Sequence, residues 1–196
     1  MTGGSRGSWA ELRPLMDDRF VILDTETTGL LAPELVTIAI VDHGGETLLA
    51  EAVRPAKAIE PEASRISGIT LESVADQPEF PAIAADVSRT LAGRRVVIYN
   101  APYDTQVLRN TYARYGLEVP PFQPWCAMEW FARLYGEWDE GRGTYRWQPL
   151  SKAAAYFGVA QGAAHNAVAD CLTTWRILEE AFRRSGLRVR GMEPLL

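Results

Sequence analysis

Residues 20–30 read Phe20-Val21-Ile22-Leu23-Asp24-Thr25-Glu26-Thr27-Thr28-Gly29-Leu30. The four apolar residues at the start predict a short buried strand. Side chains two residues apart on a strand point to the same face, so the carboxylates of Asp24 and Glu26 project together. Two adjacent negative charges repel, and a hard divalent cation such as Mg²⁺ or Mn²⁺ accepts an all-oxygen ligand set. A strand that simply ends in an acidic turn is the alternative for this segment alone.

The composition predicts one ordinary globular domain. The chain has 196 residues, of which 47% are apolar, and this fraction is enough for a sizeable core. The net charge of −5 opposes polyanion binding through overall charge, although local arginines can still hold phosphates. Two cysteines do not make a disulfide framework, and the longest apolar run is too short to span a bilayer. No apolar core of a signal peptide is visible at the start, so we expect a cytoplasmic protein that has no membrane partner.

The order of the expected elements predicts an α/β fold. Strands are expected at 20–24, 35–42, 46–54 and 95–100, and the turn His43-Gly44-Gly45 predicts a hairpin between the second and third. Helices are expected at 81–91, 103–115, 125–135, 150–157 and 166–184, with short helical turns within 62–74 and loops at 116–124 and 136–149. We therefore predict a mixed sheet, an antiparallel meander plus parallel strands, flanked by helices. It would occupy residues 20–185, between an N-terminal arm, 1–19, and a C-terminal tail, 186–196.

Further ionisable residues lie at comparable positions. Asp104 follows the strand at 95–100, at the start of the next helix, where ligands collect in open α/β sheets. His165 and Asp170 open the last helix, and a histidine in a frayed first turn can lie over a site into which Asp170 projects. Taken singly, Asp104 could be an acid favoured by the helix dipole, and Asp170 could be an interior ion-pair partner.

Three motifs follow one another along the chain: Asp24-x-Glu26, Asn100-x-x-Tyr103-Asp104 and His165-x-x-x-x-Asp170. Together they resemble the exonuclease motifs of the DEDDh 3′–5′ exonucleases, over residues 20–184. That family has an RNase H-like fold and includes the ε proofreading subunit of bacterial DNA polymerase III and RNase T. His165 stands where the sister DEDDy group has tyrosine.

The resemblance implies an exonuclease domain at residues 20–185 and a two-metal hydrolysis with Mg²⁺ or Mn²⁺. The implied metal ligands are Asp24, Glu26, Asp104 and Asp170, and these four acids with His165 form the implied catalytic set. His165 would take the proton of the attacking water. The implied contacts to the terminal nucleotide are Thr27, Gly29, Leu30, Asn100 and Tyr103. Segment 65–70 departs from the family pattern, because Ser67 stands where the family has histidine, and this puts one substrate contact in doubt.

Two other groups of residues have more than one interpretation. The loop at 136–149 interleaves aromatic and basic residues and could contact a nucleic-acid strand: Trp138, Arg142, Tyr145, Arg146 and Trp147. Trp125 and Trp130 are expected in the core. Cys171 follows Asp170 directly, so a cysteine nucleophile is one interpretation. The stronger expectation is that Cys171 is a small, buried, apolar residue.

We therefore predict a metal-dependent 3′–5′ exonuclease that releases nucleoside 5′-monophosphates from single-stranded DNA ends. An exoribonuclease, as in the RNase T and oligoribonuclease branches, is the alternative within the same family. A non-catalytic module that binds single strands is the alternative from another class, and the intact set of four acids and one histidine argues against it. The resemblance to ε also allows a DNA polymerase as a partner.

Overall fold

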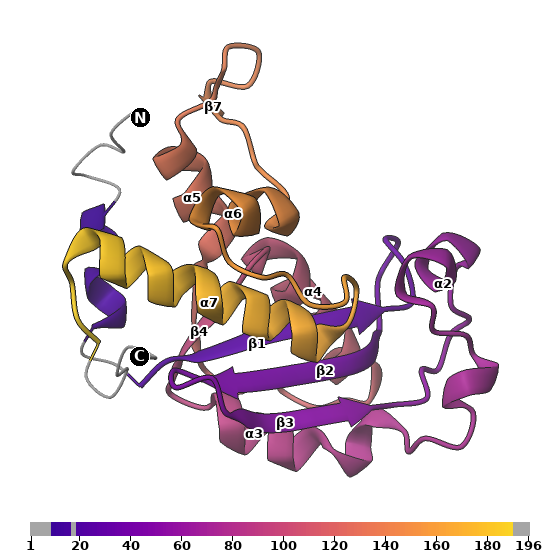
Figure 1. The fold of residues 1–196 in the computed structure, drawn as a ribbon. Helices are drawn as coiled ribbons and strands as arrows, with labels where there is room; N and C mark the ends of the chain where they lie inside the picture. Colours follow the sequence, from indigo (N-terminus) through magenta and orange to yellow (C-terminus); the bar gives the residue numbers. More distant parts are fainter. Residues whose placement is uncertain (1–8, 17–18, 190–196) are drawn as a thin grey trace.

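The protein is described by a computed structural model that covers residues 9–16 and 19–189. Much of the predicted arm, 1–19, and tail, 186–196, lies outside the described residues. The centre of the fold is a five-stranded mixed sheet with the strand order β3-β2-β1-β4-β5 (Figure 1). The predicted α/β architecture is therefore confirmed.

The sheet combines an antiparallel half with a parallel half. Antiparallel pairing joins β1 (Val21–Thr27), β2 (Leu35–Asp42) and β3 (Thr47–Ala52). On the other side of β1, the strands β4 (Arg95–Ile98) and β5 (Gln123–Cys126) run parallel to it. The carboxyl ends of β1, β4 and β5 consequently meet at one edge of the sheet, where ligand sites form in such folds.

The helices follow the predicted order with small shifts. The α-helices are α2 (Pro61–Ser67), α3 (Ala84–Leu91), α4 (Ala101–Arg114), α5 (Ala127–Tyr135), α6 (Leu150–Phe157) and α7 (Ala167–Ser185). Short 3₁₀ turns are η1 (Arg13–Leu15), η2 (Glu72–Val74) and η3 (Phe80–Ala82). Within the described ranges, no helix has the length and apolar character needed to cross a membrane.

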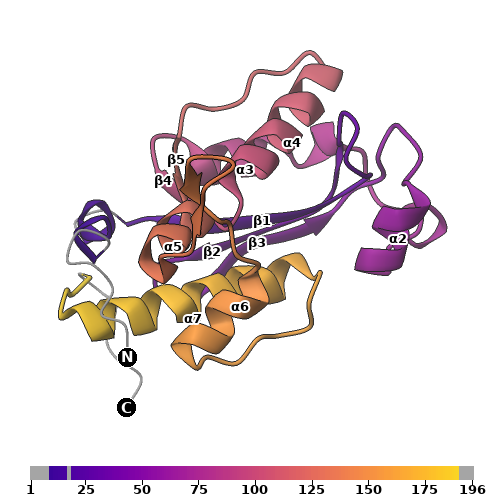
Figure 2. The ribbon, with the colours of Figure 1, turned by 90° about the horizontal axis from the view of Figure 1, so that it is seen from above.

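Strand alternation divides the apolar residues of the sheet between two cores. Ile22 and Val97 point to one face and pack with residues of α5, α6 and α7. Leu23 and Ile98 point to the other face and pack with residues of α3 and α4. Figure 2 shows α6 and α7 on one side of the sheet and α3 and α4 on the other. Burial on both faces explains why the first half of β1, 21–23, and most of β4, 96–98, are continuously apolar.

Three segments differ from the sequence predictions. The helix expected at 125–135 begins only at Ala127, because residues 125–126 belong to β5. Pro124 favoured a loop there, but an edge strand tolerates a proline, since one side of it has no partner. β1 extends three residues beyond the expected end at Asp24. The loop expected at 136–149 contains a small hairpin of β6 (Trp138–Asp139) and β7 (Thr144–Tyr145).

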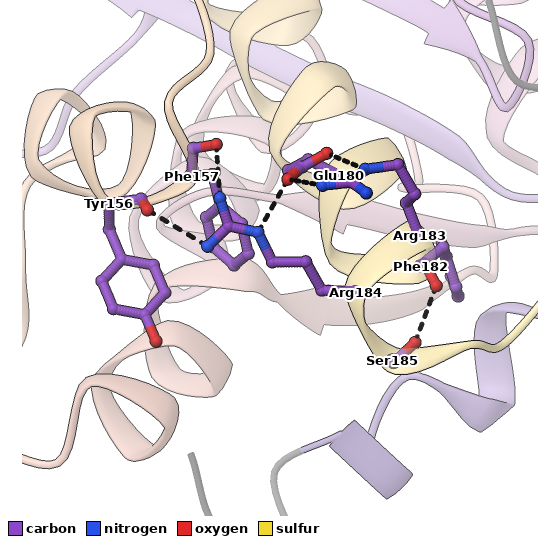
Figure 3. Close-up of polar contacts among 7 residues, drawn as sticks. All are labelled: Tyr156, Phe157, Glu180, Phe182, Arg183, Arg184 and Ser185. Atoms are coloured by element: carbon purple, nitrogen blue, oxygen red, sulfur yellow. Dashed lines mark hydrogen bonds and ion pairs between the residues drawn. The ribbon is translucent and has the colours of Figure 1, made fainter. Parts of the chain in front are cut away.

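One arginine attaches the end of α7 to the end of α6. Arg184 donates from Nη1 to the carbonyl oxygen of Tyr156 at 3.3 Å and from Nη2 to that of Phe157 at 2.8 Å (Figure 3). These carbonyls lie in the last turn of α6, which leaves its final carbonyls without partners inside the helix. Glu180 accepts from Arg184 Nε at 2.7 Å and also pairs with Arg183, so the guanidinium of Arg184 is held in place (Figure 3).

Candidate active site

The strand β1 presents different chemistry on its two faces. Ile22 belongs to the core under α7, so Asp24 and Glu26, at alternate positions after it, point toward the α7 side. Thr25 has the opposite parity and points toward α4. The sequence prediction that the two carboxylates share a face is therefore consistent with the register of the sheet.

Asp104 meets β1 through Thr25 rather than through an acid. Thr25 donates its hydroxyl to Asp104 Oδ1 at 2.7 Å, and both side chains are buried. Burial raises the pKa of Asp104 to about 7, although the hydrogen bond from Thr25 acts in the opposite direction. The charge of Asp104 also helps to raise the pKa of Asp24 and of Glu26, so α4 brings this acid close to the β1 pair.

The start of α7 positions the third motif. Asn166 caps the helix by accepting a hydrogen bond at Oδ1 from the backbone N–H of Ala169, at 3.1 Å. His165 precedes the cap with φ 59°, a left-handed conformation that is costly for a residue with a side chain. Its backbone N–H donates to Asp170 Oδ2 at 3.1 Å. The helix start thus places His165 next to Asp170, one residue before the N-cap rather than in the first turn of the helix.

Three of the predicted site residues form a compact group of possible metal ligands. One ligand atom each from Glu26, His165 and Asp170 lies within 4.8 Å of the other two. The second carboxylate oxygen of Asp170, Oδ1, is buried and has no hydrogen-bond partner among the described residues. A buried carboxylate oxygen without a donor is costly unless a cation or a proton satisfies it. The donor set and this orphaned oxygen fit a divalent cation.

The acids of the site repel one another in a buried environment. The pKa of Asp24 is raised well above its ordinary value, chiefly by burial and then by the charges of Asp104, Asp170 and Glu26. Burial, followed by the charges of Asp170 and Asp104, raises the pKa of Glu26 to about 7. Burial also raises the pKa of Asp170, although the backbone N–H and charge of His165 oppose the shift. Protons or cations are therefore needed to hold these carboxylates together.

The residues predicted to contact the terminal nucleotide are partly linked to one another. The hydroxyl of Tyr103 donates to the carbonyl oxygen of Gly29 at 2.8 Å and lies 2.6 Å from Thr27 Oγ1. Leu30 follows with 79% of its surface exposed. Asn100 occupies the N-cap position of α4, and its carbonyl oxygen accepts from the backbone N–H of Tyr103. The structure thus gathers these residues next to the end of β1.

Glu60 also lies at this edge, and sequence reasoning missed it. A methyl group added at Gly29, where φ is 146°, would lie 2.1 Å from the carboxyl carbon of Glu60. The same carboxylate accepts from the backbone N–H of Leu30 at 3.4 Å, and the Glu60 N–H donates to Thr28 at 2.7 Å. The carboxylate of Glu60 could move aside, but the φ of 146° is one that residues with a side chain rarely adopt, so the backbone favours glycine at position 29. A lone glutamate before a helix gives no signal of this contact, which joins segments about thirty residues apart.

Other residues singled out in the sequence have local roles. Ser67 donates its hydroxyl to the carbonyl oxygen of Ala63 at 2.9 Å and accepts from the backbone N–H of Ile69, so it completes the end of α2. The thiol of Cys171 is buried against the carbonyl oxygens of Ile22 and Ala39, and burial raises its pKa well above the ordinary value. The expectation that Cys171 is a buried apolar residue is therefore confirmed. Trp130 is buried and Trp125 packs against the core, also as expected.

Comparisons with known proteins agree with this arrangement. Residues 21–178 match the family model of the RNase T exonucleases. An exonuclease of Escherichia phage 186, named CP81 and described as uncharacterized, is 40% identical over 84% of this chain and 88% of its own length. The DNA polymerase III ε subunit of Treponema pallidum is 32% identical over 77% of this chain and 70% of its own. The ε subunit of Haemophilus influenzae is 30% identical, but only 44% of its length is covered.

Solved structures show the same fold. Exonuclease X, in complex with 5′ overhanging duplex DNA, has a TM-score of 0.64 at 27% identity and is covered over 96% of its chain. Escherichia coli exonuclease I, in complex with single-stranded DNA, has a TM-score of 0.70 at 20% identity, and this chain spans 41% of it. Since the family match extends over most of the chain and both sets of relatives agree with it, this protein belongs to the RNase T family of exonucleases.

Proposed function

We propose that the protein is a metal-dependent 3′–5′ exonuclease that releases nucleoside 5′-monophosphates from single-stranded DNA ends. The observation that carries the proposal is the cluster at the carboxyl edge of the sheet, where Glu26, His165 and Asp170 approach within 4.8 Å beside the buried Asp24 and Asp104. Such a concentration of acids is costly for a binding surface and useful for hydrolysis of a phosphodiester.

The four acids would hold two divalent cations, Mg²⁺ or Mn²⁺. When bound, such ions offset the charge of the phosphate and lower the pKa of water. Asp24 and Glu26 come from the rigid β1, and Asp170 comes from α7, so the ligands are set by secondary structure rather than by loops. Thr25 would keep Asp104 ionised and oriented through the 2.7 Å hydrogen bond.

His165 would act as the general base. Its side chain is exposed at the start of α7, and its backbone is tied to Asp170. The imidazole can therefore accept a proton from a water molecule next to the carboxylates while remaining accessible to substrate. Positioned bases of this kind contribute about 10²–10⁴-fold to the rate.

The segment from Thr27 to Leu30 would receive the terminal nucleotide. Leu30 is exposed and apolar, which suits packing against a base or sugar. Tyr103 supports the backbone of this segment through Gly29, and Asn100 lies at the neighbouring start of α4. Binding of a 3′ end here would bring the last phosphodiester to the acids on β1.

DNA is the proposed substrate because the ε relatives belong to a DNA polymerase and the solved complexes contain DNA. A DNA polymerase is accordingly a proposed partner, and the cytoplasm is the proposed compartment. The assay uses single-stranded DNA and RNA oligonucleotides of one sequence, labelled at either end, with Mg²⁺, Mn²⁺, Ca²⁺ or chelator. The proposal predicts stepwise shortening from the 3′ end and mononucleotide products with Mg²⁺ or Mn²⁺ alone. Faster RNA shortening would favour the ribonuclease alternative, and binding without shortening would favour the non-catalytic one.

A further inference from the structure

The hairpin of β6 and β7 exposes two tryptophans. It extends from the body of the protein next to α5 and α6 (Figure 1). Trp138 is 48% exposed and Trp147 is 52% exposed. Trp147 has no ring partner within the described ranges. Large aromatic side chains that are exposed to solvent on a protruding element indicate an interaction surface.

Ring contacts and backbone hydrogen bonds stabilise the hairpin that carries the two tryptophans. The rings of Trp138 and Tyr145, which are paired across the strands, meet edge to face with a centroid distance of 5.2 Å. The backbone N–H of Arg146 donates to the carbonyl oxygen of Glu137 at 2.8 Å, which continues the ladder beyond β7. Trp147 follows Tyr145 by two residues, the spacing that keeps extended side chains on one face. The hairpin therefore presents its aromatic rings from a fixed backbone.

The basic residues of the hairpin are largely engaged within it. Arg146 lies 3.3 Å from Glu137 and 3.7 Å from Asp139, and Lys152, on the adjacent α6, lies 3.7 Å from Glu137. The turn carries both Arg142 and the acidic Glu140, so their formal charges cancel in the sum. The hairpin thus offers little net charge to a phosphate backbone, and its aromatic faces are its distinctive chemistry. Of the two arginines that the sequence analysis named in the 136–149 segment, Arg146 is thus paired with acids of the same segment.

The base of the hairpin is anchored beside the candidate active site. Tyr99 donates its hydroxyl to the carbonyl oxygen of Gln148 at 2.8 Å. Tyr99 directly precedes Asn100, the N-cap of the helix that carries Asp104. The buried amide of Gln148 donates to Glu137 Oε2 and to the Arg146 carbonyl oxygen, each at 3.0 Å. The base of the hairpin is therefore tied through Tyr99 to the segment that leads into α4 and Asp104.

We infer that Trp138 and Trp147 form a stacking surface for unpaired bases of the strand whose 3′ end lies in the active site. The inference rests on the proposed function for the presence of that strand. Stacking on aromatic rings tolerates any sequence, because every base has a π face. The stacking contact itself neutralises no phosphate and so releases no counterions. This surface would add binding contacts to nucleotides of the single strand beyond the terminal one.

The test measures equilibrium binding of fluorescent DNA oligonucleotides of 3 and 12 nucleotides, in chelator, so that hydrolysis is not required. Trp147→Ala should weaken binding of the 12-mer about 5- to 100-fold and leave the 3-mer nearly unchanged. Trp147→Phe should restore most of the affinity. The salt dependence of 12-mer binding should keep the wild-type slope, because no phosphate contact is lost. Leu48→Ala, an exposed apolar residue on β3, is the matched control and should have no effect.

Equal 12-mer affinity of Trp147→Ala and wild type would overturn the inference and indicate that the tryptophans serve a protein surface instead. Equal weakening of the 3-mer and the 12-mer would also overturn it. A chromogenic ester of thymidine 5′-monophosphate separates this result from the proposed function, because it is too short to reach the hairpin. If wild type and Trp147→Ala both hydrolyse this ester and bind the 12-mer equally well, the stacking surface alone is refuted. Absence of its turnover by wild type would count against the proposed function alone. Trp138→Phe should bind the 12-mer nearly as well as wild type, because phenylalanine keeps a stacking face next to Tyr145, and a large loss of 12-mer affinity would count against stacking.

Discussion

Thr25 shows how a single hydroxyl can organise two motifs of the site. Its hydrogen bond to Asp104 is buried, and it comes from the face of β1 opposite to the paired acids. Thr25→Val keeps the shape of the side chain but removes the side-chain donor to a buried carboxylate, which costs about 1–3 kcal/mol. We expect the turnover number to fall about 10-fold, equivalent to ~1.4 kcal/mol in the barrier. Thr47→Val, on the exposed edge of β3, is the control, and a Thr25→Val rate equal to that of the control would contradict the role.

His165 carries the most specific prediction for a single residue. His165→Ala should lower the turnover number about 10²–10⁴-fold, because a positioned base is lost. Oligonucleotide affinity in chelator should remain close to that of wild type, since the histidine is not proposed to bind the strand. His43→Ala, the other histidine in the sequence, provides the matched control. A His165→Ala enzyme with the turnover number of wild type would assign His165 to the structure of the α7 start.

At the scale of elements, the contact between α6 and α7 predicts a clear difference between two neighbouring arginines. Arg184 satisfies two carbonyl oxygens at the end of α6. Arg183, whose side chain is 68% exposed, pairs with Glu180 and with no other residue that the structure describes. Arg184→Met should lower the free energy of unfolding by about 1–2 kcal/mol, because charged hydrogen bonds to backbone are lost. Arg183→Met should change it by less than about 1 kcal/mol, as is usual for exposed ion pairs. Urea denaturation of both variants measures the difference, and equal losses would refute the assigned role of Arg184.

The elements also show what sequence can and cannot predict. The apolar run before Asp24 and the Asn166 cap of α7 were predictable, because local patterning and capping chemistry determine them. β5 was not, since Pro124 is tolerated only because its strand lies at the edge of the sheet. The contacts of Thr25 with Asp104 and of Glu60 with Leu30 join distant segments. Tertiary packing alone creates such contacts, so no local signal announces them.

At the scale of the whole molecule, the crowded acids predict an unusual dependence of stability on pH. The pKa of Glu26 is raised from 4.5, and that of Asp104 from 3.8, to about 7 in each case. Between the ordinary pKa of each carboxyl and its native pKa of about 7, the native protein keeps protons that the unfolded chain has lost. In chelator, the free energy of unfolding should therefore fall as the pH rises from about 5 to 7, by at most about 1.4 kcal/mol per pH unit for each carboxyl.

Divalent cations should remove this loss, because they favour the ionised carboxylates. Urea denaturation from pH 5 to pH 8, with chelator and with Mn²⁺, measures both parts of the prediction. Stability in chelator that increases from pH 5 to pH 7 would contradict the assigned charge repulsion. A metal concentration 100 times the dissociation constant should add about 2.7 kcal/mol at pH 8.

The central claim is that the acids at the carboxyl edge of the sheet form a hydrolytic metal site. It is tested most directly by the rate of mononucleotide release from a single-stranded DNA oligonucleotide as a function of Mn²⁺ concentration. The enzymes compared are the wild type, Glu26→Gln and the exposed-acid control Asp76→Asn. We predict saturable activation of wild type and control, no release in chelator, and a rate for Glu26→Gln at least about 10³-fold lower. Release by the wild type in excess chelator, or undiminished release by Glu26→Gln, would contradict the claim.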